Sequence, residues 1–563
     1  MDNRRFLLIA LLGVVLFFLY QAWQKDYARP AAALAAAASS EEIPAAQTGE
    51  VPSAVQAPGA EDTPAPAAPL SAPASAGERL VVVTDRLRAE IALDGGDLRR
   101  LDLLGYPVSK QQPDQPLTLL DDRGASYFVL QSGLGGAREP VVSHLSRYTA
   151  ASRELRLAPG ENEVVASLEA RGPAGETVIK RYRFRRDSYQ VALEHEVLNS
   201  AAEPLLFSPY TRLVRRPSAA ADSVPFVPTF LGVGFYEQKD GGEGYRFRKI
   251  ALADLPEETL DRSQPGGWLA VMQHYFIAAI LPPGGEPQRY SAKPARDGNL
   301  QSQVLGPAVT VAPGARATVA TELYLGPKLQ TRIDAVAPGL ELTVDYGILT
   351  PISEPLFWVL NWLYEQVGNW GWAIVLLTLL VKALFYKLSE AQYRSMAKMK
   401  HFAPRIQEIK DRYGDDRERL SKAMMDLYKK EGFNPLAGCW PLLVQMPVFF
   451  ALYWVFLESV ELRQADWLLW INDLTAPDPY YVLPVLYGLS MWAMQKLSGQ
   501  NATLDPMQQR IMNIMPIALT AFFAFFPSGL VLYWLVSNLV SIAQQAYITR
   551  KIEREGFGQK KPA

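Results

Sequence analysis

Lys382 is the charged residue that lies deepest within the apolar stretches of this sequence, and Thr378 precedes it by one helical turn on the same face. A lysine at the centre of a membrane helix costs roughly 2.5 to 3.5 kcal/mol, so it normally faces protein or a water-filled cavity. We favour a cavity over the alternative, in which the side chain snorkels to the inner headgroups. Neighbouring helices could bring further polar groups to the same centre: Gln445, Gln495, Ser537 and Asn538.

Local signatures of metal, nucleotide or covalent chemistry are absent from the sequence. The four histidines lie far apart, Cys439 is the single cysteine, and no HExxH, CxxC, P-loop or glycine-rich dinucleotide pattern occurs. A formal net charge of -2 excludes nucleic-acid binding driven by bulk charge. The sequence therefore predicts a protein that is not an enzyme, with no catalytic residues, metal, cofactor or nucleotide.

Two other functions fit an intramembrane lysine. A transporter or channel would normally carry one such charge, although we find no paired Gly/Pro-broken segments in two corresponding halves. An intramembrane protease would need a serine partner for Lys382, and Ser537 is the candidate.

The N-terminal part of the chain predicts an anchor and a tether. Residues 1–27 contain the uncharged apolar run Phe6–Tyr20 behind Arg4 and Arg5, which favours an uncleaved transmembrane signal anchor over a cleaved signal peptide. Residues 28–77 are rich in Ala and Pro and contain no aromatic residue, so they predict a disordered linker.

Residues 78–328 alternate apolar and polar side chains with the period of β-strands. Leu87 to Leu93 show this pattern before an Asp94-Gly95-Gly96 turn, and Tyr189 to Val197 repeat it with His195 on the apolar face. The pattern predicts a large antiparallel β-sandwich exported to the periplasm, with His195 as a satisfied core residue rather than a ligand.

The remainder predicts a membrane domain. Residues 329–369 form a connector that ends in an amphipathic interfacial helix, Ile352–Val367, and residues 370–548 form a five-helix core. Its apolar stretches are each just long enough to cross a hydrocarbon core: Trp370–Tyr386, Trp440–Val460, Tyr480–Gln495, Ile511–Pro527 and Gly529–Tyr547.

Charge bias predicts the orientation. Residues 387–438 hold 12 Lys/Arg against 8 Asp/Glu, whereas Leu462–Pro479 hold Arg463 as their one basic residue. The positive-inside rule therefore places the first segment and the basic tail, residues 549–563, in the cytoplasm. With the anchor included, the chain becomes a multi-pass inner-membrane protein with both termini cytoplasmic.

The cytoplasmic segment 387–438 predicts a helical hairpin that turns at Gly414. It is either a self-packed pair or a docking arm for a soluble partner, and the sequence leaves both open. Apolar residues at spacings of three and four form its seam: Met399, Phe402, Ile406, Ile409, Leu420, Met424 and Leu427.

Several longer motifs resemble the YidC family of bacterial membrane protein insertases, in its Gram-negative form. They span about 200 residues in the expected order: Gln392-Tyr393 with Met396–Met399, Asn434–Cys439, Leu442–Pro447, Val460–Arg463, Asp505–Gln509, and Phe526–Leu530 through Ser537-Asn538.

This resemblance implies an insertase and chaperone that inserts, folds and assembles membrane proteins through a hydrophilic, positively charged groove. It implies a β-supersandwich for the exported domain, and it assigns substrate-helix contact to Thr378, Tyr533 and Trp534. The family usually has arginine where Lys382 stands. Lysine keeps the positive charge but loses the bidentate recognition of arginine. The implied partners are nascent membrane proteins, the ribosome, membrane lipids and the Sec translocon (SecYEG and SecDF).

Overall fold

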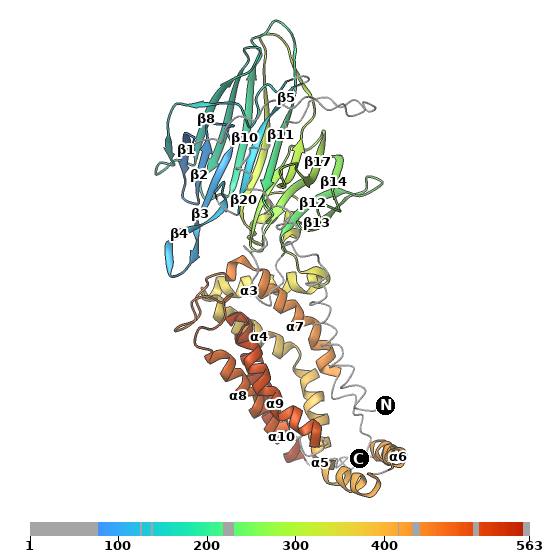
Figure 1. Ribbon diagram of the computed structural model, residues 1–563. Helices are drawn as coiled ribbons and strands as arrows, with labels where there is room; N and C mark the ends of the chain where they lie inside the picture. Colours follow the sequence, from blue (N-terminus) through green and yellow to red (C-terminus); the bar gives the residue numbers. More distant parts are fainter. Residues whose placement is uncertain are drawn as a thin grey trace. The chain divides into compact units, whose positions relative to one another are not determined.

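The computed structural model describes residues 77–123, 126–136, 139–217, 230–414, 416–430, 440–498 and 506–555. These residues fall into two compact units, one that ends at Thr343 and one that begins at Val344. The first is built of β-strands and the second of α-helices, as the sequence predicted (Figure 1). The anchor 1–27, nearly all of the linker, Cys439 and the end of the basic tail lie outside the described residues.

Within the described part of the first unit, eleven strands form one sheet. Neighbouring strands are antiparallel except for β1 and β7, and β19 and β4 attach to β11 and β3. Their order is β14 (Leu260–Pro265), β17 (Pro287–Pro294), β18 (Leu300–Leu305), β11 (Leu205–Arg215), β5 (Phe128–Gly136), β3 (Leu98–Ser109), β2 (Leu87–Ala92), β1 (Arg79–Val83) and β7 (Glu154–Arg156), with β19 (Val309–Val311) and β4 (Gln112–Leu120) beside them.

Nine strands of the same described region form a second sheet. Their order is β13 (Tyr245–Ala251), β12 (Gly232–Gln238), β15 (Trp268–Met272), β16 (Phe276–Leu281), β20 (Arg316–Pro327), β10 (Gln190–Leu198), β9 (Thr177–Arg185), β8 (Glu163–Arg171) and β6 (Thr149–Ala150). Two stacked sheets of this kind confirm the predicted β-sandwich.

The sequence alternation predicted the inward face of the strands correctly. Leu87, Ala89 and Ile91 are all buried, and the chain then reverses between β2 and β3. Gly95 and Gly96 have φ angles of 90° and 58°, which side chains with a Cβ rarely adopt. The turn therefore depends on the Gly-Gly pair that the sequence singled out.

A buried lysine links the two sheets. The Lys180 ammonium on β9 donates to the carbonyl oxygens of Gly95 (2.9 Å), Gly96 (3.3 Å) and Ser132 (3.1 Å), which belong to the other sheet and its turn. The Tyr182 hydroxyl donates to Gly96 as well, at 2.8 Å. Sequence alternation did not predict a cation here, because lysine is rarely fully buried.

His195 lies opposite Lys180 on the adjacent strand β10. It is buried as predicted, but its Nε2 atom has no hydrogen-bond partner among the described residues, so the expectation of a satisfied histidine is wrong at that atom. Burial, with a smaller contribution from the Lys180 charge, holds the pKa of His195 well below its usual range. A neutral ring avoids placing a second cation beside Lys180.

The second unit consists of helices (Figure 1). Short 3-10 turns lie before the first of them and at Val460–Leu462. The described helices are α3 (Thr350–Val367), α4 (Trp370–Leu384), α5 (Tyr386–Tyr413), α6 (Arg417–Lys430), α7 (Trp440–Glu458), α8 (Val482–Ser498), α9 (Pro506–Phe523) and α10 (Ser528–Glu555).

Helix boundaries follow local chemistry. Gly368 ends α3 in the left-handed conformation, with φ of 66°. The Asn369 side chain then accepts a hydrogen bond from the Trp372 amide at 3.0 Å and begins α4. α5 ends at Tyr413 and α6 begins at Arg417, on either side of the turn that the sequence predicted at Gly414.

The five predicted apolar stretches coincide with α4, α7, α8, α9 and α10. Within the described residues, however, no single helix combines the length and the hydropathy of a membrane-crossing segment. α4 and residues Tyr386–Ser395 of α5 meet both conditions only when they are counted together, and they are bent by 64°. The number of spans therefore stays a prediction.

The loop between α7 and α8 is folded around two acidic side chains. The Asp478 carboxylate accepts hydrogen bonds from the Trp470 indole (3.0 Å) and from the amides of Tyr480 and Leu483 (3.0 and 2.8 Å). Asp473 accepts from the amides of Gln464 and Thr475 and from the Thr475 hydroxyl. The Asp478 bonds fix the start of α8, and the Asp473 bonds hold the loop before it.

The same loop is joined to the start of α10. The Ser528 amide donates to the Ala476 carbonyl at 2.8 Å, and the Gly529 amide donates to the Leu474 carbonyl at 2.9 Å. The loop therefore holds the first turn of α10, the helix that carries most of the candidate site.

Candidate functional site

Polar side chains follow one another along α10, and most of them contact a neighbouring helix. In chain order they are Tyr533, Ser537, Asn538, Ser541 and Gln544. Spacings of three and four residues place such positions along one side of a helix. α10 is therefore the element that brings the polar groups of the bundle together.

Lys382 on α4 is buried next to Ser541, with 7% of its surface exposed. Its ammonium donates to the Ser541 hydroxyl at 2.9 Å, which is the one hydrogen bond of that ammonium among the described residues. In the same set of residues, no carboxylate lies within ion-pair distance of it. A buried cation without a counter-ion attracts negative charge strongly, because water screens it poorly.

Thr378 and Ser537, two other predicted groove residues, take part in hydrogen bonds within their own helices. Thr378 is almost fully buried, and its hydroxyl donates to the Ile374 carbonyl of its own helix at 2.7 Å. Ser537 is half-buried, and its carbonyl oxygen accepts from the Ser541 hydroxyl at 2.8 Å. Thr378 thus has its hydrogen bond inside α4, and its role in a groove stays a prediction.

Two further contacts connect α10 to α8 and α7. The Asn538 amide donates to the Ser490 hydroxyl on α8 at 3.2 Å. The Gln445 side chain on α7 lies close to the Tyr533 hydroxyl. Lys382 of α4, Gln445 of α7 and Asn538 of α10 therefore lie at different turns along α10 and do not meet at one point.

Tyr533 and Trp534 are both buried rather than presented on an outer face. The Trp534 indole stacks on Phe449 of α7 with ring centroids 5.3 Å apart, and it packs against Phe523 of α9 at 4.0 Å. Its indole nitrogen is buried without a hydrogen-bond partner in the described residues. The predicted contact of these residues with a substrate helix remains untested, and it would require the aromatic cluster to open.

Sequence reasoning missed Ser541, Gln544, Ser490 and Tyr393. Ser541 had a signal, since it follows Ser537 by one helical turn. Ser490 had none, because its partner lies on another helix and far away in sequence. Tyr393 belongs to a family motif, but nothing in the sequence indicated that it contacts α10.

The cytoplasmic hairpin retains part of its predicted seam. Ile406 is buried, whereas the other described seam side chains are half-buried, and the side chain of Met399 lies outside the described residues. Met425, next to the seam, is exposed over 49% of its surface. The half-buried members are Phe402, Ile409, Leu420, Met424 and Leu427.

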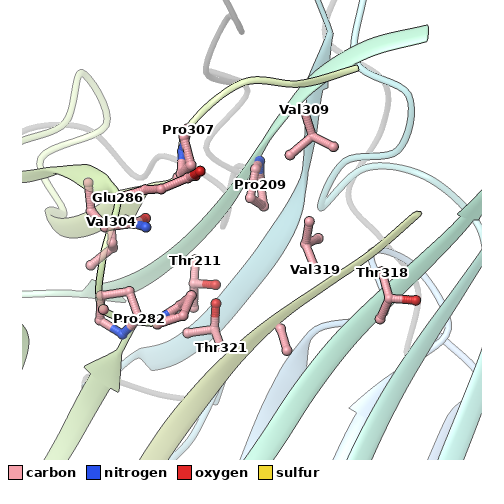
Figure 2. Close-up of a pocket in the computed structure, with 15 residues that line it drawn as sticks. Pro209, Thr211, Pro282, Glu286, Val304, Pro307, Val309, Thr318, Val319 and Thr321 are labelled. Atoms are coloured by element: carbon pink, nitrogen blue, oxygen red, sulfur yellow. The ribbon is translucent and has the colours of Figure 1, made fainter. Parts of the chain in front are cut away.

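The β unit contains a cavity of about 500 Å³. Figure 2 shows side chains of β11 (Pro209, Thr211) and β20 (Thr318, Val319, Thr321) gathered around it. Glu286 is the one titratable residue in its lining, so it offers no pair of groups for acid–base chemistry. No group of three His, Cys, Asp or Glu side chains that could hold a metal occurs among the described residues.

Comparisons with known proteins cover both units. Residues 79–359 match the family model described as the YidC periplasmic domain, and residues 362–555 match that of the 60Kd inner membrane protein. The membrane protein insertase YidC of Thioalkalivibrio sulfidiphilus is 46% identical over 99% of this chain and 100% of its own length. That of Nitrosococcus oceani is 43% identical over 99% and 100%.

A solved structure described as an active YidC insertase with its first transmembrane domain resolved is 19% identical. It covers 84% of this chain and 92% of its own, with a TM-score of 0.40. The two family models together account for both compact units, and the relatives match over nearly the whole length. The chain therefore belongs to the YidC family of membrane protein insertases of the bacterial inner membrane.

Proposed function

We propose that this chain inserts membrane proteins by drawing the polar flank of a substrate into a hydrophilic groove beside Lys382, without covalent catalysis and without nucleotide. The observation that carries the proposal is the buried Lys382 ammonium with no carboxylate partner among the described residues. Thr378, Gln445, Ser537 and Asn538 are the polar groups that we assign to the same groove.

The energetics of insertion support a hydrophilic groove of this kind. A 20-residue apolar helix gains on the order of 10 kcal/mol on entering the bilayer, so insertion itself is downhill. The barrier is the polar segment that must cross ahead of the helix, since each charge at the bilayer centre costs several kcal/mol. A buried positive charge and a row of polar groups lower that barrier for acidic segments.

Reconstitution tests the proposed function. We expect the purified chain in liposomes to protect the leading segment of a short single-span substrate from added protease, with no nucleotide present. Empty liposomes supply the control. Solute flux through the same liposomes without substrate protection would favour the transporter or channel instead.

We further propose six spans, with both termini in the cytoplasm and the β unit in the periplasm. In a Cys439→Ser background, single cysteines at the exposed positions Lys293 and Leu468 should react with a membrane-impermeant reagent from outside. Cysteines at Arg412 and Arg554 should react only from inside. Labelling of position 412 from outside would overturn the orientation.

The ribosome and the Sec translocon (SecYEG and SecDF) are proposed partners, together with membrane lipids. The basic residues at the end of α10 and beyond support electrostatic attraction to ribosomal RNA. Such attraction weakens as salt rises, so co-sedimentation with ribosomes at two salt concentrations is the measurement. The seam of the hairpin offers adaptable methionines for a protein partner.

A further inference from the structure

Ser541 is the point at which three helices meet. Its hydroxyl accepts from the Lys382 ammonium of α4 at 2.9 Å and donates to the Ser537 carbonyl of α10 at 2.8 Å. The Tyr393 hydroxyl of α5 lies close to it. A serine hydroxyl offers one donor and two acceptor sites. Ser541 is buried, and one acceptor site of its hydroxyl remains for the nearby Tyr393 hydroxyl.

Lys382 and Tyr393 lie on opposite sides of the bend between α4 and α5. Phe385 forms the break, with φ of −89° and ψ of 10°, and the two helical parts meet at 64°. The break contains neither proline nor glycine, so the sequence of the bend does not itself account for the kink. Contacts from another element must hold the angle.

α10 supplies those contacts. The Gln544 amide donates to the Lys382 carbonyl at 3.4 Å, which partners one of the last carbonyl oxygens of α4. On the far side of the bend, Tyr393 and Ala397 pack against Ile548 and Ile552. The helical segments on both sides of the bend thus contact successive turns of α10.

We propose that Ser541 is a positioning residue: it holds the Lys382 ammonium inside the bundle and, through Tyr393, couples that charge to the angle at which α5 leaves for the cytoplasmic hairpin. This inference rests on the proposed function. A lysine ammonium sits on a flexible four-carbon stem and is strongly hydrated. Without the Ser541 acceptor, the ammonium moves toward water at the end of the helix.

The first test compares Ser541→Ala with Ser541→Thr, which keeps a hydroxyl. The readout is the ratio of insertion rates for two matched substrates, one with an acidic and one with a neutral leading segment. We expect Ser541→Ala to lower this ratio roughly threefold to tenfold, the range for the net contribution of a typical hydrogen bond, and Ser541→Thr to retain it. A general folding defect would slow both substrates alike and leave the ratio unchanged.

Lys382→Ala separates this inference from the proposed function. If Lys382→Ala lowers the ratio and Ser541→Ala does not, Ser541 does not position the lysine, and the proposed function stands. If Lys382→Ala leaves the ratio unchanged, the proposed role of the charge itself is wrong. A fall in both variants supports both statements.

The second test measures the angle of the bend. Spin labels at the exposed positions Leu380 on α4 and Arg394 on α5 report the distance across it in the full-length protein. Tyr393→Phe removes the hydroxyl that reaches Ser541, and we expect it to broaden the distance distribution. Tyr547→Phe, an exposed tyrosine of α10, is the matched control. Equal distributions for Tyr393→Phe and wild type would overturn the coupling between Ser541 and the bend.

Discussion

Lys382→Ala is expected to slow the insertion of substrates with acidic leading segments roughly tenfold, while neutral substrates change by less than about twofold. A unit charge about 12 Å away contributes about 1.4 kcal/mol at the effective dielectric constant typical of protein sites. That free energy lowers the barrier only for a segment that carries negative charge, and 1.4 kcal/mol corresponds to a tenfold change in rate.

Two further substitutions separate charge from shape. Lys382→Arg should keep the preference for acidic segments, because the positive charge remains although the donor geometry differs. Lys382→Glu should slow acidic substrates most, on the order of a hundredfold, because attraction becomes repulsion at the same distance. Neutral substrates should still insert in all three variants, since the polar groups along α10 remain in place.

Initial insertion rates of the matched substrate pair in liposomes test these expectations for the Lys382 variants. Protease protection is followed over time for wild type and the three variants, and the abundance and melting temperature of each variant are measured alongside. Equal ratios of acidic to neutral rates in all four proteins would mean that Lys382 only anchors its helix at the headgroups.

Sequence patterns predicted the parts of this fold that depend on local periodicity. The buried face of β2 and β10, the Gly95-Gly96 turn and the ends of α5 and α6 follow from side-chain spacing and turn residues. The resemblance to the YidC family, carried by motifs on α5 to α10, is confirmed by the comparisons over both units.

Contacts between distant segments could not be predicted in this way. Lys382 and Ser541 are 159 residues apart, and only the packing of α4 on α10 brings them together. Thr378 shows the opposite case, because its type and position suggested a groove residue, yet its hydroxyl is used by the carbonyl one turn earlier. A side chain's partner, rather than its polarity, decides whether it is available to a substrate.

The β unit offers the second large effect: Lys180→Met is expected to destabilise it by about 3 to 5 kcal/mol at pH 7, the range for breaking a buried charged network. The methionine side chain fills similar space but donates no hydrogen bond. Three carbonyl oxygens, of Gly95, Gly96 and Ser132, would lose the ammonium that joins them to β9. The Asp97 carboxylate nearby would lose one of the cations that favour its charged form.

The same variant should change how stability depends on pH. Burial lowers the pKa of Lys180 from its ordinary value of 10.5 to about 8. Between these values the unfolded chain keeps a proton that the folded chain releases, so the contribution of Lys180 to stability rises with pH across this window. Lys180→Met removes that rise. Above about pH 10, ionisation of tyrosines in the unfolded chain opposes it, because burial raises the pKa of Tyr182 and Tyr210.

Pulse proteolysis of the full-length protein in urea, at pH 8.0 and at about pH 9.5, measures both effects on the β unit. Lys293→Met, at an exposed lysine of β17, is the matched control and should reproduce the wild-type midpoints. We expect the wild-type midpoint to rise between the two pH values and the Lys180→Met midpoint to be lower and to rise less. If Lys180→Met and Lys293→Met gave the same midpoints, the ammonium between the sheets would contribute nothing to the stability of the sandwich, and the apolar core alone would hold the two sheets together.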